Sequence, residues 1–227
     1  QIRANRKTDI PSSFNMKSKI RLIIFTLTIL VIPTIHAQKT AFEPEVYLGL
    51  NGGMSASMLY FNPQVKQSFL TGYNGGLTFR YIGKKSLGVQ AELNYSQRGW
   101  KESDGLYARQ LNYIELPFLT HFNFGDKFRY FFNIGPKISY LLSENILIDN
   151  TQNSTAEQHI KAVENPFDYG FSLGTGALIK IQKQVLQVEA RANYSLSNVF
   201  SDAKKDYFNY SNNLYASVNF TWLFQIK

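Results

Sequence analysis

The chain has 227 residues, of which 44% are hydrophobic, 15% aromatic and only 18% charged, and its formal charge is +8. This composition excludes a disordered chain, because disorder needs few aromatic residues and many charges. The sequence has no cysteine, which excludes a disulfide scaffold and any thiolate metal site. The length predicts one or two domains.

The N-terminal segment has the pattern of a secretory signal peptide. Met16 is followed by three basic residues, the apolar run 22–32, and Ala37 as a small residue at the expected cleavage site. The run is too short to cross a bilayer, which takes about 20 residues; a short buried helix is the alternative. We predict a signal peptide at 16–37 and a mature domain at 38–227. Residues 1–15 are polar and do not begin with Met, and we interpret them as an unstructured upstream extension.

Most of the positive charge belongs to this N-terminal segment. Residues 1–37 contain six of the 24 Lys and Arg residues and one of the 16 acidic residues, which leaves 18 bases and 15 acids, or +3, from Gln38 onward. No basic run remains there, so binding to nucleic acid loses its main support.

The mature region alternates between apolar and polar residues with a period of two, which is typical of β-strands. In the clearest stretch, Leu87, Val89 and Ala91 alternate with Gln90 and Glu92. Eight such strands are predicted, at about 45–53, 71–82, 87–98, 110–124, 128–141, 167–181, 185–197 and 212–225.

The connections between these strands are alternately long and short. The short ones are about 83–86, 125–127 and 182–184, and the long ones are about 54–70, 99–109, 142–166 and 198–211. Short periplasmic turns and long extracellular loops are typical of an outer-membrane barrel. The predicted fold is an all-β, eight-stranded, antiparallel up-and-down transmembrane barrel, closed because an open sheet edge cannot face lipid.

A soluble eight-stranded barrel of lipocalin type is the competing architecture, with its apolar face turned inward. Its outer face should be rich in Lys and Glu, whereas the polar face here is mostly Gly, Ser, Asn, Thr and Gln. Aromatic residues also lie near the ends of the apolar faces, as in interfacial girdles. These residues are Tyr81, Tyr95, Tyr130, Tyr140, Tyr169, Tyr194 and Trp222. Both features favour the membrane barrel.

The polar face predicts a structural network inside the barrel. If Gly125-Asp126-Lys127 forms the turn, Phe124 faces Phe128, and Glu115 lies directly opposite Lys137. A buried charge needs a partner, so this pair is expected to be an interior salt bridge rather than a gate or proton path. The full network is expected to comprise Arg80, Glu92, Glu115, Lys137, Asp168, Glu189 and Arg191.

The strand register of the other members of this network is predicted less directly, because it does not follow from a single turn. Glu189 and Arg191 are expected opposite or near Gly176 and Gly174, which would leave room for their side chains. Glu92, Arg80 and Asp168 are expected in that same layer. An eight-stranded barrel is just wide enough for its side chains to fill, so free diffusion of solutes is not expected.

Two prolines conflict with a regular ladder, because proline donates no hydrogen bond and a closed barrel has no edge. With the same register, Pro117 faces Gly135 and lies beside Pro136. A bulge or local break is expected there, as a structural kink rather than a hinge.

Residues that could form a catalytic or ligand-binding site are scarce. After residue 37 the only histidines are His121 and His159, and a hydrolase site would need one of them beside a nucleophile and an orienting group. Ser139 and Ser143 are expected at the other end of their strand from His121. No metalloprotease, phosphate-loop or nucleotide motif is present, so no catalytic, cofactor or metal site is predicted.

Three segments resemble the PorT-like porin family of outer-membrane β-barrels. They are LNYIELPFL at 111–119, NIGP at 133–136 and DYGFSLGTG at 168–176. The resemblance covers about 42–227, and the ending Gln225-Ile226-Lys227 departs from the usual final aromatic residue. It implies an outer-membrane location, and for some relatives a role in protein secretion.

The expected function is that of a non-enzymatic outer-membrane barrel with a side-chain-filled lumen. Its long loops, especially 142–166, would bind a surface or a protein partner, or assist secretion. The alternative is a narrow or gated porin-type channel, and an enzyme is a distant third. Outer-membrane lipid is the one partner that the fold requires, and the oligomeric state stays open.

Overall fold

The computed structural model describes residues 42–151, 154–200 and 207–227. The chain divides into the units Gln1–Ala41 and Phe42–Lys227, and only the second is described. The predicted extension at 1–15 and signal peptide at 16–37 therefore lie outside the described residues. Within the described residues, no helix has the length and apolar character needed to span a membrane.

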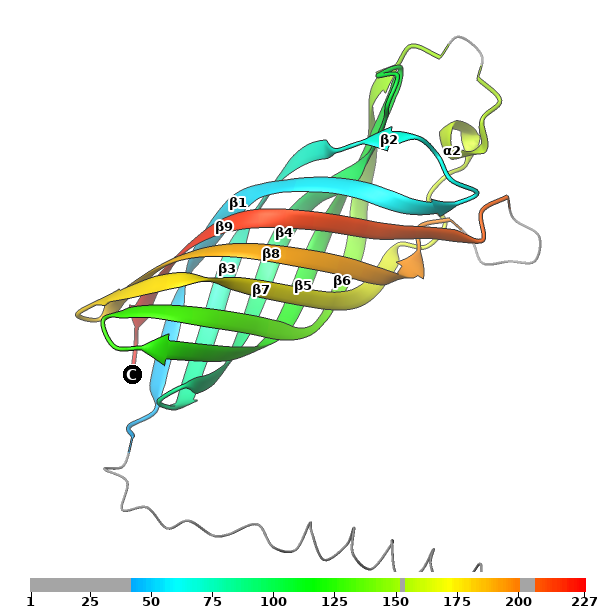
Figure 1. The fold of residues 1–227 in the computed structure, drawn as a ribbon. Coiled ribbons are helices and arrows are strands. Elements are labelled where there is room, and N and C mark those ends of the chain that lie inside the picture. The colour runs from blue at the N-terminus through cyan, green and yellow to red at the C-terminus, as the bar shows by residue number, and fades with distance from the viewer. Residues whose placement is uncertain (1–41, 152–153, 201–206) are drawn as a thin grey trace, which may run out of the picture. The chain divides into compact units, whose positions relative to one another are not determined.

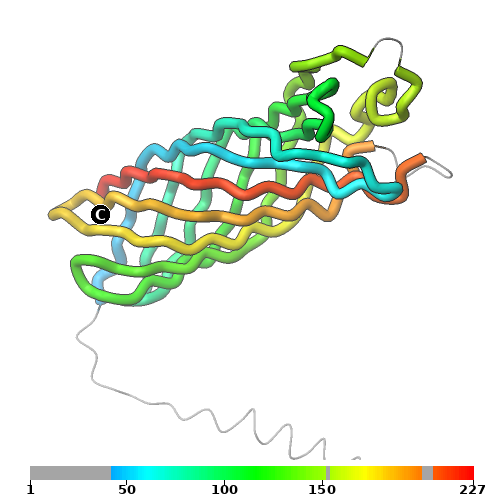
Figure 2. Tube along the Cα trace, turned by 45° about the horizontal axis from the view of Figure 1, so that its top comes forward, coloured from blue at the N-terminus to red at the C-terminus, as the bar shows by residue number. Residues whose placement is uncertain are grey.

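Eight long antiparallel strands form a closed ring (Figures 1 and 2). Around the ring the order is β4, β3, β1, β9, β8, β7, β6 and β5, and β5 pairs with β4 to close it. The strands are β1 (Glu45–Asn62), β3 (Leu70–Lys84), β4 (Leu87–Glu102), β5 (Tyr107–Gly125), β6 (Phe128–Asp149), β7 (Phe167–Ile181), β8 (Gln184–Asn198) and β9 (Tyr210–Gln225). The short strand β2 (Gln67–Ser68) pairs with β4, and the short helix α2 (Glu157–Ile160) lies between β6 and β7. The predicted eight-stranded, up-and-down architecture is confirmed.

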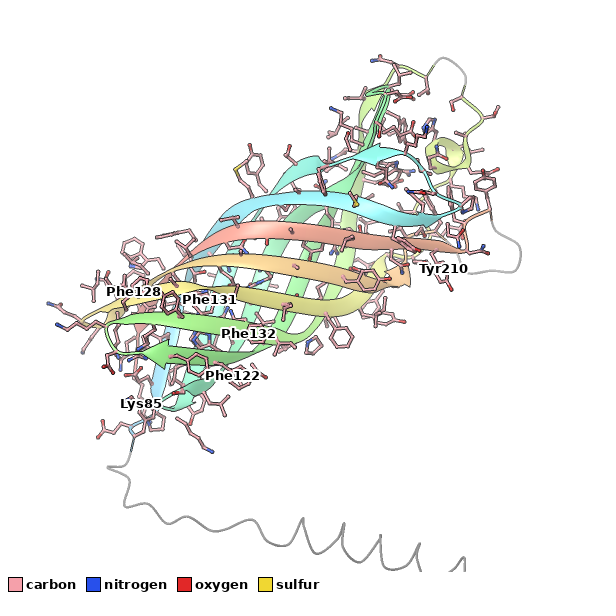
Figure 3. The ribbon with its side chains drawn as sticks, viewed as in Figure 1. Lys85, Phe122, Phe128, Phe131, Phe132 and Tyr210 are labelled. Atoms are coloured by element: carbon pink, nitrogen blue, oxygen red, sulfur yellow. The ribbon has the colours of Figure 1, made fainter. Side chains whose placement is uncertain are left out.

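One end of the ring carries only tight turns. β3 ends at Lys84 and β4 begins at Leu87, and the turns after β5 and β7 are equally short. We call this the short-turn end, and the opposite end the long-loop end. Figure 3 shows Lys85 at the first and Tyr210 at the second.

The prediction of a long loop at 99–109 is wrong. β4 continues to Glu102 and β5 begins at Tyr107, so only a four-residue turn separates them. Polar residues and Gly99 interrupt the alternation there, so the sequence pattern ends before the strand does. The same effect makes β1 and β6 longer than predicted.

The two faces of the strands differ as the alternation requires. Large apolar side chains point outward, as Leu50, Val188 and Phe220 show, while polar side chains fill the interior. All seven predicted girdle aromatics are on the outer face, between 40% and 66% exposed. Figure 3 labels one pair of neighbours on β6, of which Phe131 is buried in the lumen and Phe132 is partly exposed on the outside.

The register predicted for the β5–β6 hairpin is wrong by two residues. Gly125 pairs with Arg129, so Phe124 faces Tyr130 rather than Phe128. Gly125 has a φ of +114°, which glycine adopts readily, and this conformation starts the turn, so that three residues separate the last paired residues of the two strands, Gly125 and Arg129. Glu115 consequently pairs with Ser139, not with Lys137.

Pro117 likewise pairs with Lys137 instead of Gly135. The ladder between β5 and β6 stops at that pair and resumes at Thr120 and Ile134 without a change of register. The expected local break is therefore present, but it is not a bulge. A Cβ at Gly135 would lie 1.9 Å from the Phe118 oxygen, so glycine permits the close approach of the two strands.

Candidate functional site

The lumen is filled by two groups of buried charged side chains, each with two cations and two anions. We call the group nearer the short turns the lower charge cluster; it contains Arg80, Glu92, Glu189 and Arg191. The upper charge cluster contains Arg98, Glu115, Lys137 and Asp168. Each cluster has a formal charge of zero, which satisfies the requirement that buried charges be paired.

Arg191 organises the lower charge cluster. Its Nη1 and Nη2 donate to the two carboxylate oxygens of Glu92 at 2.8 and 2.7 Å, and its Nε and Nη2 donate to Glu189 at 3.1 and 2.9 Å. Bidentate pairs of this type are the strongest charge-assisted hydrogen bonds. Arg191 therefore holds both carboxylates in one fixed arrangement.

Arg80 joins this cluster through amides rather than by direct ion pairs. Its guanidinium donates to the side-chain oxygens of Gln90 and Gln187. Gln90 in turn donates to Glu92 at 2.5 Å, and Gln187 donates to Glu189 at 3.1 Å. The two glutamine side chains thus bridge the Arg80 guanidinium to the two carboxylates.

The glycines of β7 make room for these side chains, and their predicted positions are confirmed. Gly174 pairs with Arg191 and Gly176 pairs with Glu189. A Cβ at Gly174 would lie 1.9 Å from the Glu189 Oε1, so the carboxylate occupies the space that a larger residue would need.

Arg98 and Lys137 share the two carboxylates of the upper charge cluster. Arg98 Nη1 lies 3.2 Å from Glu115 and its Nη2 lies 2.9 Å from Asp168. Lys137 Nζ lies 3.5 Å from Glu115 and 3.3 Å from Asp168. Glu115 and Lys137 are therefore in contact although they are not directly opposite, because long side chains also reach diagonal positions.

Hydroxyl groups complete the upper charge cluster. Tyr215 and Ser139 donate to Glu115, while Ser195 and Ser197 donate to Asp168. The Arg98 guanidinium also lies 3.8 Å from the centre of the Tyr113 ring. Each carboxylate thus receives hydrogen bonds beyond its ion pairs, which a buried charge requires.

The structure corrects the predicted network in two respects. Asp168 lies in the upper charge cluster and not in the layer of Glu92 and Arg80. Arg98 was not among the predicted members, although it is fully buried and contacts both carboxylates of its cluster. The sequence signal that identifies Arg98 as an interior residue is its position on the polar face of an alternating strand.

Hydrophobic side chains close the lumen at both ends. At the long-loop end, aromatic and aliphatic residues from β1, β4, β5 and the 199–209 connection pack together; we call this set the aromatic plug. It contains Leu59, Phe61, Trp100, Tyr107, Leu111, Tyr113, Val199, Phe200 and Phe208. At the short-turn end a second group closes the ring, formed by Tyr47, Ile82, Phe131, Leu178, Val185 and Leu223.

His159 holds the β6–β7 connection against the long-loop end. Its ring stacks on Tyr107 with a centroid distance of 3.9 Å, its Nε2 lies 2.8 Å from Glu102, and its Nδ1 lies 2.7 Å from the Ser154 hydroxyl. A cavity of about 520 Å³ adjoins this group and is lined partly by Glu102, Ala156 and Gln158. These contacts bring a serine, a histidine and a carboxylate together. Neither the spacing of these residues in the sequence nor the composition indicates this combination.

The other histidine has a structural environment. His121 is buried near the short-turn end, where its Nδ1 lies 2.7 Å from Asn133 Oδ1. Throughout the described ranges, no three His, Asp or Glu side chains come together in a way that could hold a metal ion.

Residues 36–201 match the family described as outer membrane protein beta-barrel domain. No curated protein matches the chain. Among solved structures, Neisserial surface protein A of Neisseria is similar with 10% identity and a TM-score of 0.47, over 82% of this chain and 100% of that one. The attachment invasion locus protein Ail of Yersinia pestis is similar with 12% identity and a TM-score of 0.42, over 79% and 99%.

The family match covers most of the chain, and the closed ring with an apolar outer face agrees with it. A closed barrel satisfies every backbone group without water, as a lipid environment demands. The chain belongs to the outer membrane protein beta-barrel domain family and is a protein of the outer membrane.

Proposed function

We propose that the protein is a non-enzymatic outer-membrane barrel with a closed lumen, which binds a protein partner or a surface at its extracellular, long-loop end. The observation that carries this proposal is the bidentate pair of Arg191 and Glu92. These residues come from β8 and β4, which are four strands apart in both directions around the ring. The pair therefore crosses the full width of the lumen.

We also propose that the barrel is PorT-like and that residues 16–37 are its signal peptide. The segments 111–119 and 168–176 carry the resemblance, and they supply Glu115 and Asp168 to the upper charge cluster. Assistance to a secretion machine is the form of partner binding that this resemblance implies.

Planar-bilayer recordings test the closed lumen. Purified protein, checked for folding by its heat-dependent shift on a gel, is expected to give no steady conductance. A steady, reproducible conductance from the folded form would favour the porin-type channel instead.

Site-specific crosslinking in native outer membrane tests partner binding. A photo-crosslinking residue at Ile160, which is exposed in α2, is expected to capture a defined protein or surface glycan. The matched control is the same residue at Lys85, which is exposed in a periplasmic turn. Equal products at both positions would contradict binding at the extracellular end.

Ester hydrolysis is a second candidate function, favoured by the contacts of His159 with Ser154 and Glu102. It ranks second because the Ala156 N–H donates to the same serine oxygen and reduces its nucleophilicity. The protein is expected to leave p-nitrophenyl butyrate intact. Hydrolysis that is lost in both Ser154→Ala and His159→Ala would overturn the non-enzymatic proposal.

A further inference from the structure

The strand β6 has an edge without a partner at the extracellular end. β6 pairs with β7 only as far as Tyr140, which lies opposite Phe167, and Leu141 N–H still donates to the Pro166 oxygen at 2.7 Å. On its other side β6 remains paired with β5 as far as Asp149. Among the described residues, therefore, nothing pairs with the outer edge of residues 142–149, which we call the β6 edge.

The β6 edge lies beyond the membrane. Tyr140 is one of the exposed girdle aromatics, and the strand continues past it, away from the short-turn end. Figures 1 and 2 show β5 and β6 continuing together past the point where β7 leaves the sheet. Its backbone N–H and C=O groups therefore face water and not lipid.

The chain covers two other edges at this end, those of β4 and β1. The two residues of β2 pair with Glu102 and Lys101 at the end of β4. The Gln67 side chain then imitates a peptide group against β1, since its Oε1 accepts from Leu59 N–H at 3.0 Å and its Nε2 donates to Leu59 O at 2.8 Å. Proteins usually protect free edges in such ways because an open edge pairs with other chains. The uncovered β6 edge therefore calls for an occupant.

Bulges limit the regular part of the β6 edge to four residues. The β5–β6 register shifts on either side of the stretch from Ser143 to Ile146, which pairs without interruption with Asn112 to Arg109. The extra residues at the two shifts, Leu142 and Leu147, are 56% and 49% exposed, and Ile146 is 54% exposed. An added strand would thus find a short regular ladder flanked by exposed aliphatic side chains.

The charged residues on the end of β6 and on the following connection as far as α2 are all acidic. Residues 138–160 contain Glu144, Asp149 and Glu157 but no lysine or arginine. The Glu144 carboxylate remains 36% exposed although it accepts from Arg109. An occupant with basic residues is therefore favoured over an acidic one or a second copy of this acidic edge.

We propose that the β6 edge binds an extended, lysine- or arginine-bearing segment of another protein, which adds as a strand beside Ser143–Ile146. Main-chain hydrogen bonds supply the affinity in this mode, and alternate side chains supply the selectivity. The proposal rests on the proposed function and names the surface and the kind of partner.

Peptide binding to the full-length protein in detergent micelles tests this. The probe is a fluorescent octapeptide of alternating lysine and valine, followed by fluorescence anisotropy. The controls are the same peptide with alternate backbone nitrogens methylated, so that it cannot pair, and an alternating glutamate and valine peptide. Both controls are expected to bind at least tenfold more weakly. Absence of binding by the probe, or equal binding of the methylated peptide, would overturn the proposal.

Two proline variants locate the site. Neighbouring residues of a strand point their N–H groups to opposite edges, so only one of Asn145→Pro and Ile146→Pro removes an outward N–H without breaking a bond to β5. One of the two is expected to weaken probe binding at least tenfold while the heat-dependent gel shift stays unchanged. Full binding by both folded variants would overturn the assignment.

A second copy as the occupant gives a different result. The protein would then be a dimer in micelles, and excess probe would not dissociate it, which would overturn the choice of partner. Bilayer recordings on the same preparation test the closed lumen separately, so the two proposals can fail independently.

Discussion

Arg191 of β8 and Glu92 of β4 join opposite walls of the barrel through two hydrogen bonds of 2.7 and 2.8 Å. A second connection of this kind lies above it, where the Tyr215 hydroxyl of β9 donates to Glu115 of β5, also four strands away in both directions. These two links brace a barrel that has no disulfide. They also occupy the path that a solute would have to follow.

Removal of one partner of the lower link should destabilise the barrel strongly. Arg191→Met leaves two carboxylates buried without their cation, and breaking a buried ion pair costs about 3–5 kcal/mol. The double variant Glu92→Gln with Arg191→Met removes one of those charges and should recover part of the loss. Urea unfolding in micelles, followed by tryptophan fluorescence, measures both.

The matched control for that experiment is an exposed ion pair. Lys85 and Asp126 lie 3.9 Å apart with side chains that are 77% and 91% exposed. Lys85→Ala should change the free energy of unfolding by less than about 1 kcal/mol. A loss for Arg191→Met no larger than that of Lys85→Ala would contradict the bracing role.

Glu115 offers a comparison between charge and hydrogen bonding in the upper link. Glu115→Gln keeps an oxygen that can accept from Tyr215 and Ser139, whereas Glu115→Ala leaves both hydroxyls, Lys137 and Arg98 without this acceptor. We therefore expect Glu115→Ala to lower the thermal unfolding temperature more than Glu115→Gln. Equal and negligible effects would show that the pairing contributes nothing.

The sequence predicts the number of strands and the face of each residue because a period of two is read within one strand. It does not predict register by the same means. A shift of one residue would turn every apolar side chain inward, but the observed shift of two at the β5–β6 hairpin leaves all faces unchanged. The alternation therefore could not distinguish Ser139 from Lys137 as the residue opposite Glu115.

Contacts across the lumen are harder still to predict. The pairing of Arg191 with Glu92, and the separation of Asp168 from that layer, depend on the combined stagger of all eight strands. The contact of His159 with Glu102 depends on a turn after β4 that is shorter than the pattern indicated. The charged residues of the lumen can be identified from their positions in the strands. Their partners cannot be predicted without the geometry of the closed ring.

A side chain at Gly174 should be accepted only at the expense of the lower charge cluster, because the Glu189 carboxylate occupies the place of its Cβ. Gly174→Ala would displace that carboxylate from Arg191 and should cost about 1–3 kcal/mol of stability. The control is Gly52→Ala, since a Cβ there would have only Asn74 O within 4 Å, at 3.7 Å. Equal urea midpoints for the two variants would show that Glu189 can move without loss.

His159 should control the accessibility of the β6–β7 connection. The ring stacks on Tyr107 and contacts Glu102, and the Lys161 oxygen nearby accepts from Arg109 at 2.6 Å. Loss of the stacking and the hydrogen bond amounts to about 1–2 kcal/mol of local stability, or about a tenfold larger open population. His159→Ala should therefore speed trypsin cleavage after Lys161 on intact cells about tenfold, as followed by mass spectrometry of the released fragments. Ile160→Ala is the matched control, because that side chain is exposed in the same helix. If both variants are cleaved at the wild-type rate, the connection is held by its other contacts and His159 does not anchor it.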